Sequence, residues 1–586
     1  MHKKSILIIV FITLLTYGNV LQNDFVGDDE VVIVRNTFYR SWSNLPRLFQ
    51  KDYITQSDNA LLAIDQDNGS GSVAYRPVLS LTYFIDYGIW QKNPFGYHLT
   101  NLLLHAFNAL LVYFLFFFLT GRWGIALLGA ILFSVHPIQA EAVCNIGYRA
   151  DVLSAFFALL SFVCFVRHDS PATAGRNLWY GASLVSFFLA LFSKESVIVL
   201  PLLLLCYDFY ISNRTIKNVL QNLLQRYGGY FVIAVFYAYV YCYVFPNSTL
   251  AGGGILWMDG KISAHLTKMG LIFLFYVRDL VAPFAVVAIP PFYAPPIAAG
   301  WGYKIFAAVS ILLLIGVLIF KKSDKQKIVP FLLLWFLIAL LPVSQIVPIV
   351  TPMAHRFLYL PSVGFLAVLA IAIEKITLRL TQNKDIPSLG KIFQNSVVAV
   401  CMIFTFVLNA AWKGSYTIAM HWIDYYPKNP QGYFIAGVEY LKAGFFNEAK
   451  IFLERSLALG MEDPRLYHSL GLVYLKEPAV AKQFFARAVE SFPFHGISYI
   501  GLGRSLLFEG DYTKALLYLK KSLELMPSYT GYGYLMQTLL FLNRAEELPE
   551  VLREAQKVVT DKEQIESLQK FMSLPEPLKE PIDIGL

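Results

Sequence analysis

The chain has 586 residues, of which 56% are hydrophobic and 15% are charged. This composition is too apolar for a soluble enzyme of that length, so we expect a protein embedded in lipid. The net charge of +8 does not indicate nucleic-acid binding, because most Lys and Arg residues fall in short connections between apolar runs. The five cysteines form no CxxC pair and no cluster with histidine, which argues against a disulfide framework and a zinc site.

The first apolar run covers residues 5–21 and follows the basic segment His2-Lys3-Lys4. No cleavage site of the small-x-small kind stands out after it, so we expect an uncleaved anchor with its N-terminus in the cytoplasm rather than a cleaved signal sequence. The next segment, 24–92, is polar, aromatic and too irregular to span a membrane. With its borders it predicts a large outer loop over 22–96.

Further apolar runs approach the ~20 residues that a helix needs to cross a hydrocarbon core about 30 Å thick. They lie near 97–120, 123–143, 150–166, 177–193, 196–211, 228–246, 301–320, 328–347, 357–376 and 393–411. The run at 264–288 is weaker, because charged residues and Pro283 interrupt it, and it spans, re-enters or lies on the surface. A crossing there would place the lysine cluster at 321–327 outside, against the positive-inside rule. We therefore predict about eleven spans and a C-terminus outside.

After Trp412 a repeat with a period of about 34 residues begins, which is the length of a tetratricopeptide (TPR) helix pair. Its small packing positions are Gly437 and Ala449, Gly471 and Ala481, and Gly503 and Ala515. Small residues let two helices approach closely, and stacked pairs bury what one pair cannot bury alone. The sequence thus predicts an all-α chain: a membrane helix bundle over 1–412, then a soluble TPR α-solenoid over 413–586 with about three repeats and a degenerate cap. Such an array binds an extended peptide or a partner protein, or serves as a structural cap.

Three adjacent carboxylates follow the first apolar run, in the string Gly27-Asp28-Asp29-Glu30. On spacing alone such a group is most often a solvated acidic patch. Its place favours a functional role, because the predicted topology puts it where an outward-facing active site would receive substrates at the membrane surface.

A second set of ionisable residues lies at the predicted outer ends of later helices, on the same side as the acidic string. It consists of His136, Glu141, Arg149, Asp151, Lys194, Glu195, His355 and Arg356. Each of these residues alone can be explained as an interfacial side chain that reaches for water, Lys194 above all. Together, carboxylates and cations suit a reaction that needs a base for an acceptor hydroxyl and positive charge for a phosphate leaving group.

A third group brackets the end of the outer loop. Arg76 stands in Tyr75-Arg76-Pro77, and His98 stands in Asn93-Pro94-Phe95-Gly96-Tyr97-His98, with His105 further along. A lone histidine is more often a hydrogen-bonded packing residue than a ligand. The sequence has no Gly-rich phosphate loop, no Ser/His/Asp signature and no HExxH spacing, so nucleotide hydrolysis and proteolysis lack support.

In this order, the strings resemble those of the transmembrane and tetratricopeptide repeat (TMTC) proteins. The resemblance rests on Asp28-Asp29 with Ile33 and Asn36, Tyr75-Arg76-Pro77, Asn93 to His98, His136-Pro137 with Glu141-Ala142-Val143, Arg149-Ala150-Asp151, Ser193-Lys194-Glu195 and Tyr359 to Phe365. It covers nearly the whole chain. Two positions depart from the family pattern: His355 stands where a Glu is usual, and Tyr148 stands where a Gly usually precedes Arg149. The repeat array is also much shorter than in eukaryotic members.

The resemblance implies the GT-C glycosyltransferase fold and a sugar donor linked to polyprenyl phosphate, with the acidic motif in the first outer loop. In eukaryotes the family transfers mannose to Ser or Thr of proteins. Carried over to this chain, Asp28 and Asp29 match the family's acidic pair, one of them the catalytic base. From charge and side, we assign Arg149, Lys194 or Arg356 to the donor phosphate.

The expected reaction is an inverting displacement of polyprenyl phosphate by an acceptor hydroxyl, catalysed by a transferase of the GT-C type. Expected partners are the lipid-linked sugar, membrane lipid and an acceptor protein or peptide presented by the TPR array; no metal site is assigned, and a divalent cation stays open as a cofactor. The membrane is a bacterial inner membrane or the endoplasmic reticulum, with the TPR domain outside or luminal. Transfer to a glycan or lipid, a non-enzymatic scaffold and a transporter are the alternatives; the large outer loop and the charges on one face argue against the transporter.

Overall fold

The computed structural model describes a large part of the chain, and within that part every regular element is helical. The described residues are 2–50, 74–170, 173–212, 214–245, 262–290, 327–346, 349, 351–382, 386, 388–559, 561–574 and 578–585. They divide into two compact units, with the boundary between Thr417 and Ile418. The predicted all-α class is confirmed, and the boundary falls a few residues beyond the predicted one after Trp412.

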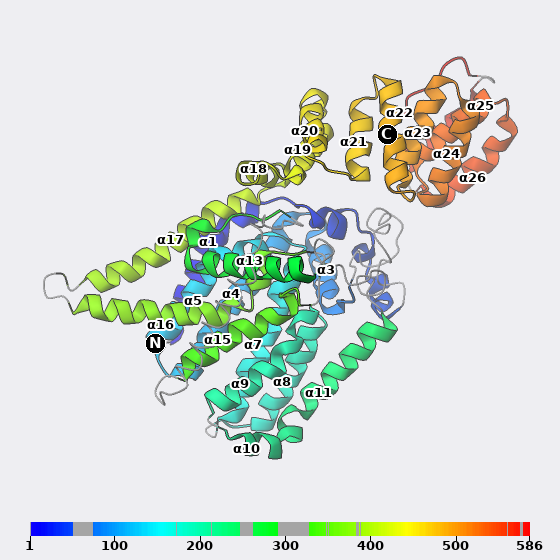
Figure 1. Cartoon of the computed structure of the whole chain (residues 1–586). Coiled ribbons are helices and arrows are strands. Elements are labelled where there is room, and N and C mark those ends of the chain that lie inside the picture. Colours follow the sequence, from blue (N-terminus) through cyan, green and yellow to red (C-terminus); the bar gives the residue numbers. More distant parts are fainter. Residues whose placement is uncertain are drawn as a thin grey trace. The chain divides into compact units, whose positions relative to one another are not determined.

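The first unit is a bundle of helices of unequal length (Figure 1). Its α-helices are α1 (His2–Tyr17), α3 (Pro77–Trp90), α4 (Pro94–Thr120), α5 (Trp123–Val135), α6 (Ala140–Cys144), α7 (Arg149–Asp169), α8 (Arg176–Leu191), α9 (Leu200–Tyr210), α10 (Ile216–Gln221), α11 (Leu223–Tyr239), α13 (Ile262–Val281), α15 (Ile328–Leu340), α16 (Ser362–Thr381) and α17 (Leu389–Ala411). Short 3-10 segments matter for the site: η1 (Gly18–Gln22), η7 (Pro137–Gln139), η8 (Glu195–Val199) and η13 (His355–Leu358). Helix α18 (Ser415–Tyr425) crosses the boundary between the units.

Helix α4 illustrates how local sequence sets the limits of an element. The side chain of Asn93 caps its start by accepting a hydrogen bond from the backbone N–H of Phe95 at 3.1 Å, and Pro94 occupies the first turn. The helix stops at Gly121, whose φ of +63° is the left-handed conformation that glycine adopts at little steric cost. Between these signals it runs for 27 residues, long enough to cross a bilayer.

Five described helices have the length and hydropathy of membrane spans. They are His2–Gln22, Pro94–Thr120, Arg149–Asp169, Leu223–Val244 and Leu389–Ala411, and the pair Trp123–Val135 and Pro137–Cys144, bent by 50°, is a sixth candidate. Each coincides with a run that the sequence predicts as a span, so the chain is a membrane protein. Helix α13, over the segment whose crossing was in question, is not among them. The run at 301–320 lies outside the described residues, and the total of about eleven spans stays a prediction.

The predicted outer loop over 22–96 is not irregular throughout, because it contains the 14-residue helix α3. Pro77 occupies the first turn of this helix, where its missing N–H has no partner to lose. The aromatic residues that suggested an irregular segment instead form a local core, in which Phe38 and Tyr39 pack against Phe84 with ring centroids 5.4 and 5.3 Å apart. The described parts of the loop, 22–50 and 74–96, are therefore folded parts of the first unit.

The second unit consists of stacked helix pairs (Figure 1). Its helices are α19 (Pro430–Lys442), α20 (Phe446–Ala458), α21 (Pro464–Val473), α22 (Pro478–Ser491), α23 (Gly496–Glu509), α24 (Tyr512–Leu525), α25 (Tyr529–Phe541), α26 (Leu548–Val558) and α27 (Lys562–Lys570). The predicted close approach within each pair is confirmed: a Cβ atom added to Gly437, Gly471 or Gly503 would lie 2.7, 2.5 or 2.6 Å from Leu453, Phe485 or Leu519, respectively. The glycines are therefore required where the helices cross.

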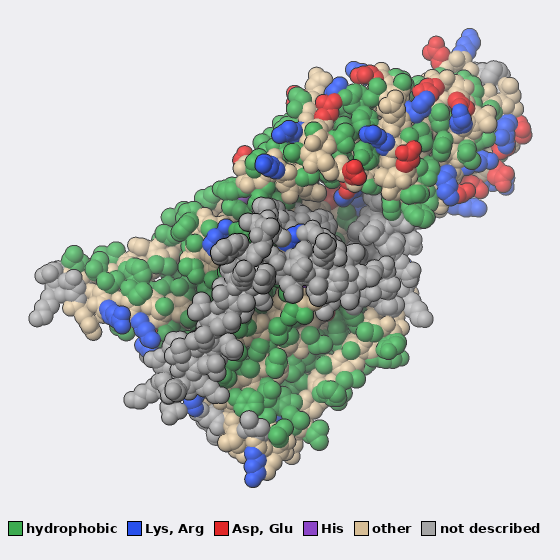
Figure 2. Space-filling model, in the orientation of Figure 1, with side chains coloured by type: hydrophobic (Ala, Val, Ile, Leu, Met, Phe, Trp, Pro, Cys, Tyr) green, Lys and Arg blue, Asp and Glu red, His purple; other side chains and the backbone are tan. Residues whose placement is uncertain are grey.

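The two units differ in surface character. Figure 2 shows that apolar side chains dominate the described surface of the first unit, whereas Lys, Arg, Asp and Glu gather on the second. Exposed apolar residues such as Leu7, Phe231 and Ile403 lie on candidate spans, where lipid would cover them. The surface pattern thus agrees with a lipid-embedded first unit and a water-exposed second one.

Candidate active site

The acidic string folds into a turn that hides one carboxylate and leaves the other accessible. Asp29 is 0% exposed: its Oδ2 accepts a hydrogen bond from the backbone N–H of Val26 at 3.0 Å, and its Oδ1 accepts one from the backbone N–H of Gly147 at 2.6 Å. Asp28 is exposed. The two neighbours therefore differ in kind, since Asp29 fastens the loop from inside and Asp28 lies on the surface.

The partner of this loop is the turn between α6 and α7. Asn145 strengthens the join, because its Nδ2 donates to the carbonyl of Val26 at 3.3 Å while its Oδ1 accepts from the backbone N–H of Tyr148 at 3.2 Å. A Cβ atom on Gly147 would lie 3.2 Å from Asn145 Oδ1 and 3.3 Å from Asp29 Oδ1. A side chain at position 147 would therefore require Asn145 and Asp29 to move by a few tenths of an ångström.

The burial of Asp29 changes the pKa of its carboxyl group. It raises the pKa of Asp29 to about 7, because removal from water outweighs the backbone N–H groups of Val26 and Gly147, which favour the ionised form. The neighbouring carboxylate of Asp28 raises the pKa of Asp29 further. Asp29 thus exchanges its proton near neutral pH.

An ion pair between Glu141 and Arg356 lies close to the same turn. Glu141, on α6, accepts hydrogen bonds from the backbone N–H groups of His355 and Arg356 at 2.7 and 3.2 Å and pairs with the Arg356 guanidinium. That guanidinium also stacks on the ring of Tyr148, 3.9 Å from its centroid. Because Tyr148 follows Gly147, the cation of Arg356 is brought beside the acidic loop.

Two further ion pairs continue this group. Lys194 Nζ pairs with Asp151 Oδ1 at 2.5 Å, and both side chains are 10% exposed. Arg76 makes a bidentate pair with Glu195, through bonds of 3.1 and 2.7 Å. Burial raises the pKa of Glu195, but the charge and hydrogen bonds of the Arg76 guanidinium, together with the charge of Lys194, outweigh burial and lower this pKa to about 2. Electrostatic interactions link the pairs, because Lys194 is near Arg76 and Arg356 is near Asp151. Three cations from separate parts of the sequence thus lie close together, each with a carboxylate partner.

Arg149 is built into the interior instead. It is 0% exposed, its guanidinium pairs with Asp86 at 2.6 Å, and Asn101 Oδ1 accepts from its Nε at 2.7 Å. Further bonds run to Thr82 and to the carbonyl of Tyr97, each 3.0 Å long. These contacts join α3, α4 and α7, so the geometry favours a structural role for Arg149 over contact with a substrate.

The four histidines named in the sequence analysis lie in different surroundings. His98 Nε2 is 3.4 Å from the carbonyl of Asp24 and so helps to place the acidic loop. His136 caps the short segment η7, its Nδ1 accepting from the backbone N–H of Ile138 at 3.2 Å. His355 Nε2 is 2.9 Å from Asp279 Oδ2 on α13. His105 contacts the hydroxyl of Tyr359 at 2.7 Å and the carbonyl of Ser134 at 3.0 Å, as expected of a packing residue.

Sequence reasoning missed two carboxylates that organise the group, Asp86 and Asp279. Both are almost fully buried, and they pair with Arg149 and His355, respectively. The available signal was their position, because each interrupts an apolar segment where an unpaired charge would be costly. Gly147 carried no such signal, since its role depends on a contact with a distant loop.

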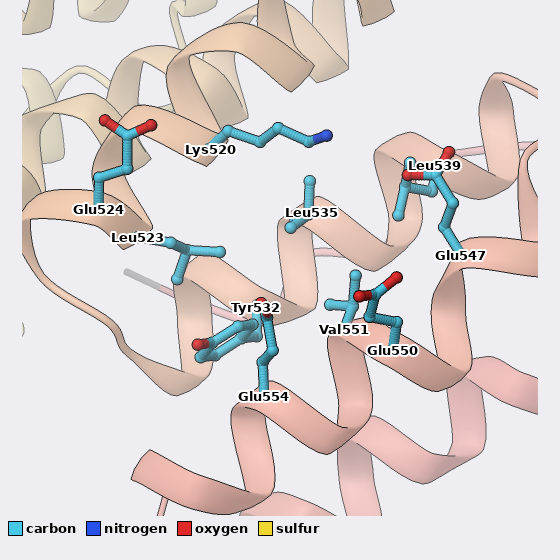
Figure 3. Close-up of a pocket in the computed structure, with 10 residues that line it drawn as sticks. All are labelled: Lys520, Leu523, Glu524, Tyr532, Leu535, Leu539, Glu547, Glu550, Val551 and Glu554. Carbon is cyan, nitrogen blue, oxygen red and sulfur yellow. The ribbon is translucent and has the colours of Figure 1, made fainter.

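The second unit contains a cavity of about 450 Å³, shown in Figure 3. An apolar floor is surrounded by four glutamates and one lysine. The lining residues are Lys520, Leu523, Glu524, Tyr532, Leu535, Leu539, Glu547, Glu550, Val551 and Glu554. None of the predicted site residues lines this cavity. In the described part of the chain, no group of three or more His, Cys, Asp or Glu side chains is placed to hold a metal ion.

Comparison with known proteins identifies relatives along most of the chain, although no family model matches it. A protein O-mannosyl-transferase of Caenorhabditis elegans, F38B6.6, is 24% identical over 446 residues, which is 74% of this chain and 59% of that protein. Human TMTC3 is 24% identical over 451 residues, or 72% of this chain and 47% of its own length. Human TMTC1 is 34% identical over 147 residues, 25% of this chain and 16% of its length.

Solved structures give weaker likenesses. The archaeal oligosaccharyltransferase AglB of Archaeoglobus fulgidus has a TM-score of 0.42 at 16% identity, covering 74% of this chain and 58% of its own. The TPR protein YrrB has a TM-score of 0.24 at 20% identity, covering 33% of this chain and 97% of its own. Both scores are too low to support a statement about fold or function.

The curated relatives that match most of the chain are considerably longer than it is, since the chain spans about half the length of each. They are named as protein O-mannosyl-transferases, as are the shorter matches. The resemblance predicted from the motifs is confirmed: the chain is similar in sequence to the TMTC protein O-mannosyl-transferases.

Proposed function

We propose that this chain is a membrane glycosyltransferase that moves a sugar from a polyprenyl-phosphate donor to a hydroxyl group of a protein. The single observation that carries the proposal is the group formed by the acidic loop, the 145–148 turn and the cation of Arg356. It combines an accessible carboxylate with positive charge on one side of the first unit. The names of the relatives support transfer to protein, with mannose as the sugar.

Asp28 is the base in this proposal, and Asp29 positions it. Both oxygens of Asp29 already accept backbone hydrogen bonds, and the residue has no exposed surface. Asp28 is exposed next to it and can reach an acceptor in solution. General-base assistance of this kind is worth about 100- to 10,000-fold in rate.

Arg356 is the preferred ligand for the donor phosphate, with Lys194 and Arg76 beside it. Among the described residues, the Arg356 guanidinium donates a hydrogen bond only to Glu141. Its other N–H groups can therefore donate to phosphate oxygens. The side chain is 15% exposed, whereas Arg149 is 0% exposed and bonded in several directions. We therefore assign Arg149 to the scaffold of the site rather than to the donor.

The reaction is a displacement at the anomeric carbon of the sugar. Asp28 takes the proton of the acceptor hydroxyl as its oxygen forms the new bond to that carbon. The bond from the carbon to the phosphate oxygen breaks, and the polyprenyl phosphate leaves with the electron pair, its growing negative charge stabilised by Arg356. Attack on the face opposite the leaving group inverts the configuration.

The test uses the purified chain in detergent with a polyprenyl-phosphate-linked mannose and a Ser/Thr-containing peptide. Mass spectrometry reports the transfer, and NMR of the product reports the configuration at the anomeric carbon. Transfer to the peptide hydroxyl with inversion supports the proposal. Transfer to an added glycan or lipid but not to the peptide would show that the acceptor is not a protein. If the chain binds partner proteins but transfers sugar from no donor, it is a scaffold and not an enzyme.

A further inference from the structure

The segment 578–585 of the second unit folds back onto the helices α23 and α25. In Figure 1 the C mark lies beside α22 and α23 rather than beyond α26, and contacts with α23 and α25 agree with that placement. The clearest contact is made by Gln537 on α25, whose Nε2 donates to the carbonyl of Ile582 at 2.8 Å while its Oε1 accepts from the backbone N–H of Ile582 at 2.7 Å. One side-chain amide thus satisfies both backbone groups of a single residue.

The next residue supplies a charge. Asp583 receives the guanidinium of Arg504, on α23, through bonds of 2.6 and 3.2 Å, and the hydroxyl of Tyr534 donates to the same carboxylate at 2.6 Å. The same hydroxyl oxygen lies 3.0 Å from the carbonyl oxygen of Gly585. The Arg504 side chain is only 8% exposed, so its charge would have to find another anion if Asp583 withdrew.

The third residue fills a position left open by a glycine. A Cβ atom on Gly533 would lie 2.3 Å from the Cδ1 atom of Ile584, so the missing side chain makes room for this isoleucine on the face of α25. Ile584 is half-buried there and packs against the core of the second unit. Three consecutive residues thus each have a defined contact: Gln537 binds the backbone of Ile582, Arg504 pairs with Asp583, and Ile584 packs over Gly533.

This segment is held as a bound peptide is held, rather than as a core element. The Asp583 side chain is 51% exposed and Ile582 is 41% exposed, so their burial contributes little to the fold. The contacts made by Gln537 use only backbone atoms, which any extended peptide offers, and Arg504 selects a carboxylate. Another segment with the same pattern would satisfy the same groups.

We propose that the face formed by Arg504, Gly533, Tyr534 and Gln537 is a binding surface for an extended peptide of the pattern apolar–acidic–apolar, and that Ile582-Asp583-Ile584 occupies it as an intramolecular competitor. A partner protein must displace this segment to bind. Because the competitor is tethered, its effective concentration is high and it sets a threshold for the partner. The surface does not depend on sugar transfer, so the failure of either proposal leaves the other standing.

The test measures binding of a fluorescent peptide, Leu-Lys-Glu-Pro-Ile-Asp-Ile-Gly, to the full chain in detergent by anisotropy. Asp583→Asn weakens the internal competitor, and we expect the peptide to bind this variant about tenfold or more tightly than the native chain. The matched control is Glu580→Gln, which removes an exposed carboxylate from the same segment and should leave the affinity unchanged.

A second set of measurements tests whether the peptide binds through its acidic residue and Tyr534. A peptide with Asn in place of Asp should not bind the Asp583→Asn chain. Adding Tyr534→Phe to that chain should lower its affinity for the original peptide. Equal affinity for the native chain and the Asp583→Asn variant, no binding to either, or equal binding of both peptides would overturn the proposal and make the segment a fixed structural cap.

Discussion

Gly147 donates its backbone N–H to Oδ1 of Asp29 at 2.6 Å, and this bond joins two segments that are 118 positions apart in the sequence. It fixes where the exposed neighbour Asp28 can lie relative to the start of α7. Tyr148, next to Gly147, carries the guanidinium of Arg356 on its ring. A single turn thus relates the proposed base to the proposed phosphate ligand.

The substitution Gly147→Ala tests this relationship. The added Cβ would meet Asn145 Oδ1 and Asp29 Oδ1 at 3.2 and 3.3 Å, so the loop must shift. We expect sugar transfer to fall by up to about 100-fold, because a small displacement of a catalytic group is costly. The control is Gly181→Ala on α8, where nothing lies within 4 Å of the new atom and activity should be unchanged. Native activity in the Gly147→Ala variant would show that this join does not position the base.

The stability of the chain should depend on pH through Asp29. Its pKa is raised from 3.8 to about 7, so the folded state holds a proton that the unfolded state releases. This contribution to the free energy of unfolding is complete below pH 4 and is lost as the pH rises towards 7, on the order of 1.4 kcal/mol per unit. As the pH rises from 4.5 to 7.5, the thermal midpoint of the native chain should fall relative to that of Asp29→Asn, whose amide does not titrate. A difference between the two midpoints that stays constant with pH would rule this out.

Breaking the buried pair of Glu141 and Arg356 should be costly. Glu141→Gln removes the anion of the Arg356 guanidinium and replaces one of the two acceptor oxygens by an NH2 group that faces another N–H donor, at a cost of about 3–5 kcal/mol. The exposed pair of Arg122 and Glu374 offers the contrast, because Glu374→Gln should change stability by about 0–1 kcal/mol. Chemical denaturation of the two variants in detergent measures both values. Similar losses in the two would mean that burial does not strengthen the first pair.

What the sequence could and could not predict follows from the range of the interactions. The helix pairs of the second unit were predictable, because small residues recur at the positions of Gly437 and Ala449 in the following pairs, with a period of about 34 residues. The charged residues of the candidate site could be selected as well, since Glu141, Lys194 and Arg356 stand at the ends of apolar runs, and their roles stay predictions. The sequence does not reveal that Asp29 is buried while Asp28 is exposed, because that difference depends on contact with a turn more than a hundred residues away.

The second unit should lose stability in mild acid. Burial and the neighbouring His495 lower the pKa of His468 to about 3, and burial lowers the pKa of His495 to about 4. Each contributes stability that is complete above its unfolded pKa of 6.5 and is lost as the pH falls towards the folded value. The loss is on the order of 2 kcal/mol per histidine between pH 7 and 5. Hydrogen exchange of α21 and α23, corrected for the intrinsic pH dependence, should show this loss, and His468→Gln should reduce it. Protection unaffected by pH would contradict the assignment.

The most direct test of the central claim compares Asp28→Asn with the native chain in transfer from a purified polyprenyl-phosphate-linked sugar to a peptide hydroxyl. If Asp28 is the base, the rate at saturating donor falls by about 100- to 10,000-fold while the thermal midpoint stays within a few degrees of the native value. A variant that keeps the native rate would contradict the account.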